Sequence, residues 1–299
     1  MKVLLATLLC MMAGLASSEI PSFSQDRAWE DLIAQCEMGA RDPGSPGHEA
    51  CGKWIKERLE SLGYQVEAHS FRMPDPYSEG ELELTNYRAW LPGTQDYPLT
   101  FAAHWDTRPR ADLDKDEARR EEPILGANDG ASGVAVLLEL ARLCAENGTP
   151  LPVEFLFFDG EDYGRSGERH NYLLGSTRFV QDHPAYSPRL LVLLDMVGGK
   201  HLNIRKEPFS KQAAPGQLDL IFKLAEEMGL PAFIPEVGPA VWDDHIPFIQ
   251  RGIPAVDLVD FRFPEWHTLD DTPEAFSPES LAQVGALCAR VIFETPVVW

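Results

Sequence analysis

Positive charge is scarce in this sequence. Its 299 residues include 26 Lys and Arg against 47 Asp and Glu, which gives a formal net charge of −21 at pH 7. Proteins that bind nucleic acid neutralise phosphates with clustered Lys and Arg, and this chain has too few of them. The deficit excludes a nucleic-acid partner and argues equally against a polyanionic substrate. An acidic protein is instead suited to cationic peptides and metal ions.

A long apolar run is also missing beyond the amino-terminal segment. Residues 1–18 begin with Lys2, continue as an apolar run over residues 3–15 and end in small residues, which is typical of a secretory signal peptide. The run is shorter than the roughly 20 apolar residues needed to span a bilayer. We therefore expect cleavage near Ser18 and a secreted or periplasmic protein without a stable membrane anchor. No internal repeat or linker is present, so residues 19–299 are expected to form one domain.

Cysteine is sparse, and its spacing excludes one class of site. The cysteines beyond the signal segment are Cys36, Cys51, Cys144 and Cys288. No two of them have the C-x-x-C spacing of a structural zinc site. Export permits disulfides, and Cys36 with Cys51 is the first candidate pair because the two flank one turn-rich link. Buried free thiols are an equal alternative in a chain with 44% hydrophobic residues.

The segment over residues 153–164, VEFLFFDGEDYG, organises the rest of the chain. Its continuous apolar run requires cover on both faces, which predicts a central strand in a sheet that lies between helices. The run ends in Asp159, Glu161 and Asp162, and the carboxyl end of a buried strand is where open α/β sheets place their ligand crevice. An acidic triplet taken alone is more often an exposed loop. Three further segments, however, repeat an apolar run followed by acid or histidine: LTFAAHWD, LLVLLDMVG and the approach to WHTLDD.

Apolar periodicity and turn signals predict the remaining elements. Helices are expected over residues 27–38, 48–62, 134–144, 217–228, 243–251 and 278–294. Strands are expected over residues 65–71, 80–90, 99–103, 155–158, 189–194 and 255–259. The charged residues 107–123 are interpreted as a solvated surface loop, and residues 164–175 as a loop of the size that often covers an active site.

Acids and histidines at these strand and helix ends are the candidate site residues: His104, Asp106, Asp129, Glu161, Asp162, Asp195, Asp243, Asp244, His245 and His267. Nitrogen and carboxylate ligands without thiolate suit a catalytic zinc, which takes three protein ligands and keeps an open position. Each member taken singly is more often structural than functional. The other histidines beyond the signal segment are left without a role: His48, His69, His170, His183 and His201.

Five segments resemble the zinc-dependent glutaminyl cyclases, which are similar in fold to zinc aminopeptidases with two co-catalytic metals. In chain order, from about residue 40 to 294, they are GANDGASGVAVLLELAR, FFDGED, LLDMVG, DDHIPFIQRGIP and FPEWHTLDDTPE. The first three are shared with the aminopeptidases, whereas DDHIPF followed by WHT looks particular to the cyclases. The resemblance implies a single α/β domain with a mixed, mostly parallel central sheet and helices on both faces.

The resemblance also implies a reaction, cyclisation of an N-terminal glutamine of a peptide or protein to pyroglutamate with release of ammonia. Asp129, Asp162 and His267 would bind one zinc ion per chain, and Glu161 would be the general acid and base. The protein is expected to be a monomer.

The resemblance assigns roles to three further residues. Asp195 and Asp243 would form a hydrogen-bonded acid pair, and Trp266 would be a wall for the substrate side chain. The chain departs from animal cyclases in having Asp162 where they carry Glu and Asp257 where they carry His. It also lacks their tryptophan in the loop after Asp162 and the cysteines of their active-site disulfide.

Two alternatives stay open. A secreted aminopeptidase with two co-catalytic zinc ions would use His104, Asp129, Glu161, Asp162, Asp195 and His267. A non-catalytic binding ectodomain on the same fold is the other, but loss of catalysis normally removes ligands and this chain keeps all of them.

Overall fold

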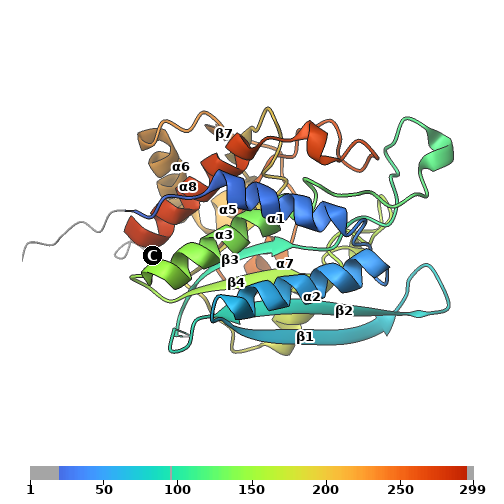
Figure 1. Ribbon diagram of the computed structural model, residues 1–299, viewed down its shortest axis with the longest axis horizontal. Coiled ribbons are helices and arrows are strands. Elements are labelled where there is room, and N and C mark those ends of the chain that lie inside the picture. Colours follow the sequence, from blue (N-terminus) through green and yellow to red (C-terminus); the bar gives the residue numbers. More distant parts are fainter. Residues whose placement is uncertain (1–19, 95, 295–299) are drawn as a thin grey trace, which may run out of the picture.

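The centre of the molecule is a six-stranded sheet, and the computed structural model describes residues 20–94 and 96–294 (Figure 1). The predicted signal segment therefore lies outside the described residues. Across the sheet the strand order is β1 (Gln65–Pro74), β2 (Glu81–Trp90), β4 (Val153–Phe158), β3 (Leu99–His104), β5 (Leu190–Asp195) and β8 (Ala255–Val259).

The sheet is mixed and mostly parallel, as the sequence predicts. The pairs β3 with β4, β3 with β5, and β5 with β8 are parallel. The pairs β1 with β2 and β2 with β4 are antiparallel, so the antiparallel strands form one edge. Each parallel strand is buried along its whole length, which explains why these strands are continuous apolar runs.

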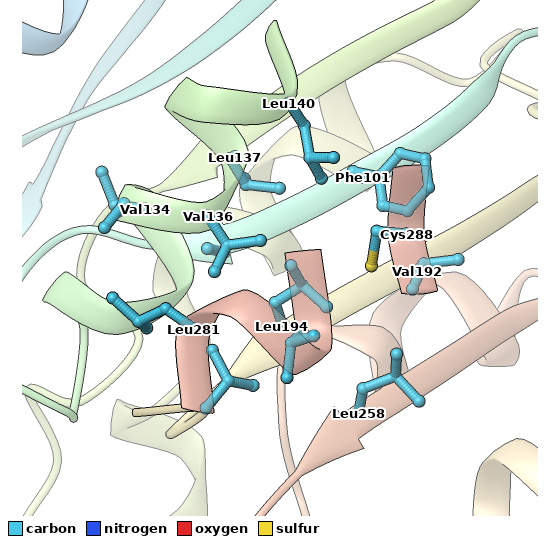
Figure 2. Packing of buried hydrophobic residues seen from close by; sticks show 14 of the residues in the cluster. Phe101, Val134, Val136, Leu137, Leu140, Val192, Leu194, Leu258, Leu281 and Cys288 are labelled. Carbon is cyan, nitrogen blue, oxygen red and sulfur yellow. The ribbon is translucent and has the colours of Figure 1, made fainter. Parts of the chain in front are cut away.

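Helices cover both faces of the sheet, and alternate strand residues pack against different helices. On one face lie α1 (Gln25–Glu37), α2 (Pro46–Ser61), α3 (Ala131–Asn147), α6 (Pro215–Glu227) and α8 (Pro278–Glu294). The other face packs against α4 (Leu174–Asp182) and α7 (His245–Gln250). Figure 2 shows the first interface, where side chains of α3 and α8 meet the strand residues Phe101, Val192, Leu194 and Leu258.

The connections around β3 bring four strand ends to one place. Helix α3 links β3 to β4 across one face of the sheet, and α4 links β4 to β5 across the other face. Strands β4 and β5 are the two neighbours of β3 in the sheet. Strand order thus reverses at β3, and open α/β sheets bind ligands at such a reversal, beyond the carboxyl ends of the strands.

Some short elements were not predicted: β6 (Ile204–Lys206), β7 (Phe233–Val237), α4 and α5 (Pro208–Ala213). They are too short to show a period, and α5 depends on a local cap in which Glu207 accepts hydrogen bonds from the N–H groups of Phe209 and Ser210. The proposed pairing of Cys36 with Cys51 is wrong, because all four described cysteines are free and buried. Burial raises the pKa of the Cys51 thiol to about 12, which suppresses the reactive thiolate.

Candidate active site

A cavity of about 380 Å³ opens beyond the carboxyl ends of the parallel strands. Its lining includes all seven residues with a predicted role in binding or catalysis: Asp129, Glu161, Asp162, Asp195, Asp243, Trp266 and His267. The five acids and the histidine are at most 9% exposed. The fold therefore gathers acids in a place where only a cation, a proton or a hydrogen-bonded ligand offsets their burial.

Asp129, Asp162 and His267 form a group in which one ligand atom from each residue lies within 4.8 Å of the others. His267 Nε2 lies 3.3 Å from Asp162 Oδ2 and 3.6 Å from Asp129 Oδ2. The shorter contact lacks hydrogen-bond geometry, so Asp162 Oδ2 is buried without a hydrogen-bond donor. Two carboxylate oxygens and one imidazole nitrogen fit a zinc ion with one coordination position left open.

The turn before α3 fixes Asp129. The buried carboxylate of Asp271 accepts hydrogen bonds from the N–H groups of Asn128, at 2.8 Å, and Asp129, at 3.2 Å. Gly130 has φ +105°, and a Cβ there would lie 2.5 Å from the carbonyl oxygen of Asp106, so only glycine fits. Asp271 belongs to the WHTLDD segment but was not among the predicted site residues.

The chain turns sharply at His267. Neighbouring side chains in an extended strand point to opposite sides, so His267 and Trp266 can both face the cavity only if the backbone turns here. His267 has φ +56°, in the left-handed region that non-glycine residues rarely adopt. Its ring centroid lies 3.9 Å from that of Trp266, and both residues line the cavity. Met196, which follows Asp195, also lines the cavity and has φ +51°. Backbone strain of this kind gathers at functional sites.

Asp106 holds the two residues of the loop after β4 that face the cavity. Its carboxylate accepts hydrogen bonds from the N–H groups of Glu161, at 3.1 Å, and Asp162, at 3.3 Å. Burial, and then the charge of Asp162, raise the pKa of Glu161 well above its ordinary value. A carboxyl group with a raised pKa can both take up and release a proton near neutral pH.

Arg108 corrects the interpretation of residues 107–123 as a solvated loop. It is fully buried, and its guanidinium donates to Asp162 Oδ1 at 2.6 Å, Asp112 Oδ2 at 2.7 Å and the Tyr172 hydroxyl at 3.0 Å. Burial acts to raise the pKa of Asp162, but His267 and Arg108 outweigh it and hold that pKa below its ordinary range. Arg108 thus occupies Oδ1 and leaves Oδ2 of Asp162 available to a metal ion.

A second acidic group surrounds His104. Its Nε2 lies 3.2 Å from Asp129 Oδ1 and 3.2 Å from Asp195 Oδ1, and these three residues also lie close enough together to hold a metal ion. Burial raises the pKa of Asp195 to about 6, although His104 opposes the shift. Burial, and then the charge of Asp195, raise the pKa of Asp243 to about 7. The predicted hydrogen bond between Asp195 and Asp243 is not seen among the described residues, where Asp243 Oδ2 has no partner. The two acids interact through their charges, and charge repulsion of this kind favours one shared proton over two ionised groups.

This arrangement predicts a pH effect on stability. Because the pKa of Asp243 is higher in the folded protein than in the unfolded chain, the folded state binds more protons and loses stability as the pH rises from about 4 to 7. We expect Asp243→Asn to remove that loss, which is on the order of 4 kcal/mol at pH 8 because the pKa rises from 3.8 in the unfolded chain to about 7 in the folded protein. Urea unfolding of the metal-free proteins at pH 5 and pH 8 measures the difference.

The control for this measurement is Asp270→Asn, which changes an exposed acid and should follow the wild-type curve. Equal wild-type and Asp243→Asn unfolding free energies at both pH values would show that Asp243 is not held protonated.

The last two candidates lie behind the cavity wall. Asp244 accepts a hydrogen bond from the Ser176 hydroxyl. His245 Nε2 lies 3.3 Å from Glu207 Oε2, an ion-pair distance without hydrogen-bond geometry. Glu207 also accepts a hydrogen bond from the N–H group of Val241, so it helps to hold the loop that lines the cavity. His48, left without a role, pairs with buried Asp159.

Comparisons with known proteins identify the family of this chain. The sequence of residues 86–292 matches the family model described as Peptidase family M28. A glutaminyl-peptide cyclotransferase-like protein of Bos taurus is 30% identical over 90% of this chain and 75% of its own. A glutaminyl cyclase of Bacteroides thetaiotaomicron, solved with N-acetylhistamine, has a TM-score of 0.89 and 33% identity over 93% of this chain and all of its own. A leucine aminopeptidase precursor from the same species gives the same TM-score and identity, over 93% of this chain and 99% of its own. The chain therefore belongs to peptidase family M28 and, within it, to the glutaminyl-peptide cyclotransferases.

Proposed function

We propose that this chain is a zinc-dependent glutaminyl-peptide cyclotransferase, an acyltransferase that converts the N-terminal glutamine of peptides or proteins to pyroglutamate and releases ammonia. The observation that carries the proposal is that Glu161, with its raised pKa, lines the same cavity as the group formed by Asp129, Asp162 and His267. The family membership supports it.

The chemistry assigns each residue a task. A zinc ion bound by Asp129, Asp162 and His267 would polarise the γ-amide carbonyl of the substrate. The neutral α-amine attacks that carbonyl carbon, and a C–N bond forms as the bond to the amide nitrogen breaks. Glu161 takes the proton from the amine and delivers it to the departing ammonia. Trp266 confines the glutamine side chain, which keeps the amine near the carbonyl and excludes water.

The alternative is an aminopeptidase. The second group, His104 with Asp129 and Asp195, and the similarity to the leucine aminopeptidase precursor favour it. One assay separates the two: ammonia released from Gln-Ala-NH₂ against free leucine released from Leu-Ala-NH₂. We expect ammonia and pyroglutamyl product from the first peptide and no leucine from the second. Release of leucine as the main activity would instead establish the aminopeptidase.

We further expect one zinc ion per chain. The pKa values of Asp195 and Asp243 are both raised by burial, which disfavours two charged carboxylates at this place and makes Asp195 a poor ligand for a second metal ion. Elemental analysis of dialysed protein should give one zinc ion, and its removal by a chelator should abolish activity. Two tightly held zinc ions that are lost together with activity would support the aminopeptidase.

Export of a monomer is also part of the proposal. Among residues 20–94 and 96–294 no helix has the length and apolar character that a membrane crossing requires. Residues 1–18 have the pattern of a signal peptide, so the mature chain should begin after Ser18. Amino-terminal sequencing of the exported protein and its mass in light scattering test both points.

A further inference from the structure

The cavity has a different character at its floor and at its mouth. The acids of its lining are all buried, at 9% exposure or less. The exposed part of the lining consists of Ser166, Gly167, Arg169, Ala240, Trp242 and Phe261. Arg169 is the only Lys or Arg among the described residues that line the cavity. The mouth therefore carries one fixed positive charge among neutral side chains.

Arg169 has no carboxylate partner within the described part of the chain, because no acid there lies within ion-pair distance of its guanidinium. Arg165, in the same loop, does have one, since its Nη2 lies 3.6 Å from Glu121 Oε2. Arg169 instead lies over the indole of Trp242, with its guanidinium carbon 5.4 Å from the ring centroid. Trp242 is 39% exposed and packs edge-on against Phe209.

A cation–π contact with an indole restrains a guanidinium and leaves its N–H groups able to bind a carboxylate. If the N-terminal glutamine lies at the floor, as the proposed function requires, the rest of the peptide leaves the cavity past Arg169 and Trp242. We propose that Arg169, held on Trp242, binds a carboxylate near the N-terminus of the substrate. This carboxylate is the side chain of an acid at the second or third position, or the C-terminus of a dipeptide.

The negative net charge of the protein makes an ion pair between Arg169 and a substrate carboxylate useful. A formal charge of −21 repels anionic peptides, and the acids at the cavity floor add to this repulsion. One unpaired cation at the mouth offsets the repulsion where the peptide enters. Arg169 then determines how well anionic glutaminyl peptides compete with neutral ones.

The test compares kcat/KM within matched pairs of substrates. The pairs are Gln-Glu-NH₂ with Gln-Gln-NH₂, Gln-Ala-Glu-NH₂ with Gln-Ala-Gln-NH₂, and Gln-Ala with Gln-Ala-NH₂, so each pair tests one source of the carboxylate. We expect Arg169→Gln to lower kcat/KM for the anionic member of at least one pair by about two- to fivefold relative to its neutral partner, the effect of one exposed ion pair. The effect should lie in KM, shrink at high salt and be restored by Arg169→Lys.

Arg165→Gln is the matched control and should leave all the ratios unchanged. A loss of activity that is equal for anionic and neutral peptides in Arg169→Gln would show a structural role of the loop and overturn the inference. Unchanged ratios in all three pairs would overturn it as well, while ammonia release from the peptides leaves the proposed function intact. Absence of ammonia release by the wild type from every glutaminyl peptide would overturn the proposed function and, with it, this inference.

Discussion

Replacing Glu161 with glutamine should leave zinc bound and lower the rate of glutamine cyclisation by about 10²- to 10⁴-fold, the range for loss of a general acid and base. The amide has almost the size of the carboxyl group, but it cannot take a proton from the attacking amine. Glu161 lines the cavity without belonging to the group of Asp129, Asp162 and His267, so the metal ligands stay in place. The measurements are kcat/KM for Gln-Ala-NH₂ and zinc content by elemental analysis.

The matched control is Glu168→Gln. It makes the same chemical change seven residues further along the loop, at a side chain that bonds Tyr77 and Asn171 and does not line the cavity. Its kcat/KM should stay within about twofold of wild type, as is usual for a change away from the reacting groups. A Glu161→Gln protein that contains zinc and works at a rate close to wild type would remove Glu161 from the mechanism.

The parallel part of the sheet could be predicted because its strands are buried along their whole length. Each of the six segments interpreted as strands is a strand of the central sheet, and the run VEFLFF is buried throughout. A short, mostly apolar run of this kind is typical of a buried strand in a chain that alternates strands and helices. Elements stabilised by single caps or short pairings, such as α5 and the ladder of β6 with β7, leave no periodic signal.

The candidate site was predictable only in part, for a similar reason. Strand ends that carry acids had to meet at one edge of the sheet, and the cavity is at that edge. Arg108 was missed because its partner Asp162 lies 54 residues away, and an arginine in a charged segment looks solvated. Asp244 and His245 follow Asp243 directly, but α7 begins there and directs the two side chains behind the cavity wall, toward Ser176 and Glu207.

Trp266 is the residue whose role is hardest to infer from the sequence, since a tryptophan at an arbitrary position is more often part of a core than of a pocket. It is half-buried, lines the cavity, and its ring centroid lies 4.7 Å from that of exposed Phe261 and 3.9 Å from that of His267. It also packs against the main hydrophobic core. Trp266 therefore contacts the core and also borders the cavity, where part of its ring is available to the substrate.

We expect Trp266→Ala to lower kcat/KM for glutaminyl peptides by about 10²-fold. Without the indole, the γ-amide carbonyl of the substrate is no longer held within reach of the α-amine that attacks it. The melting temperature should stay close to that of wild type, since much of the ring borders the cavity. Trp105→Ala is the matched comparison: Trp105 is 1% exposed and stacks on His48, so its removal should cost about 3 to 5 kcal/mol of stability.

Two measurements separate a wall of the pocket from a support for the metal ligand next to it. Zinc content should be unchanged in Trp266→Ala. The left-handed backbone conformation at His267 places the metal ligand, and it does not depend on the side chain of Trp266. Trp266→Phe, which keeps an aromatic face, should recover much of the lost kcat/KM. If Trp266→Ala instead melts far below wild type while its folded fraction cyclises glutaminyl peptides normally, Trp266 belongs to the core, and the glutamine side chain must be confined by other residues of the cavity.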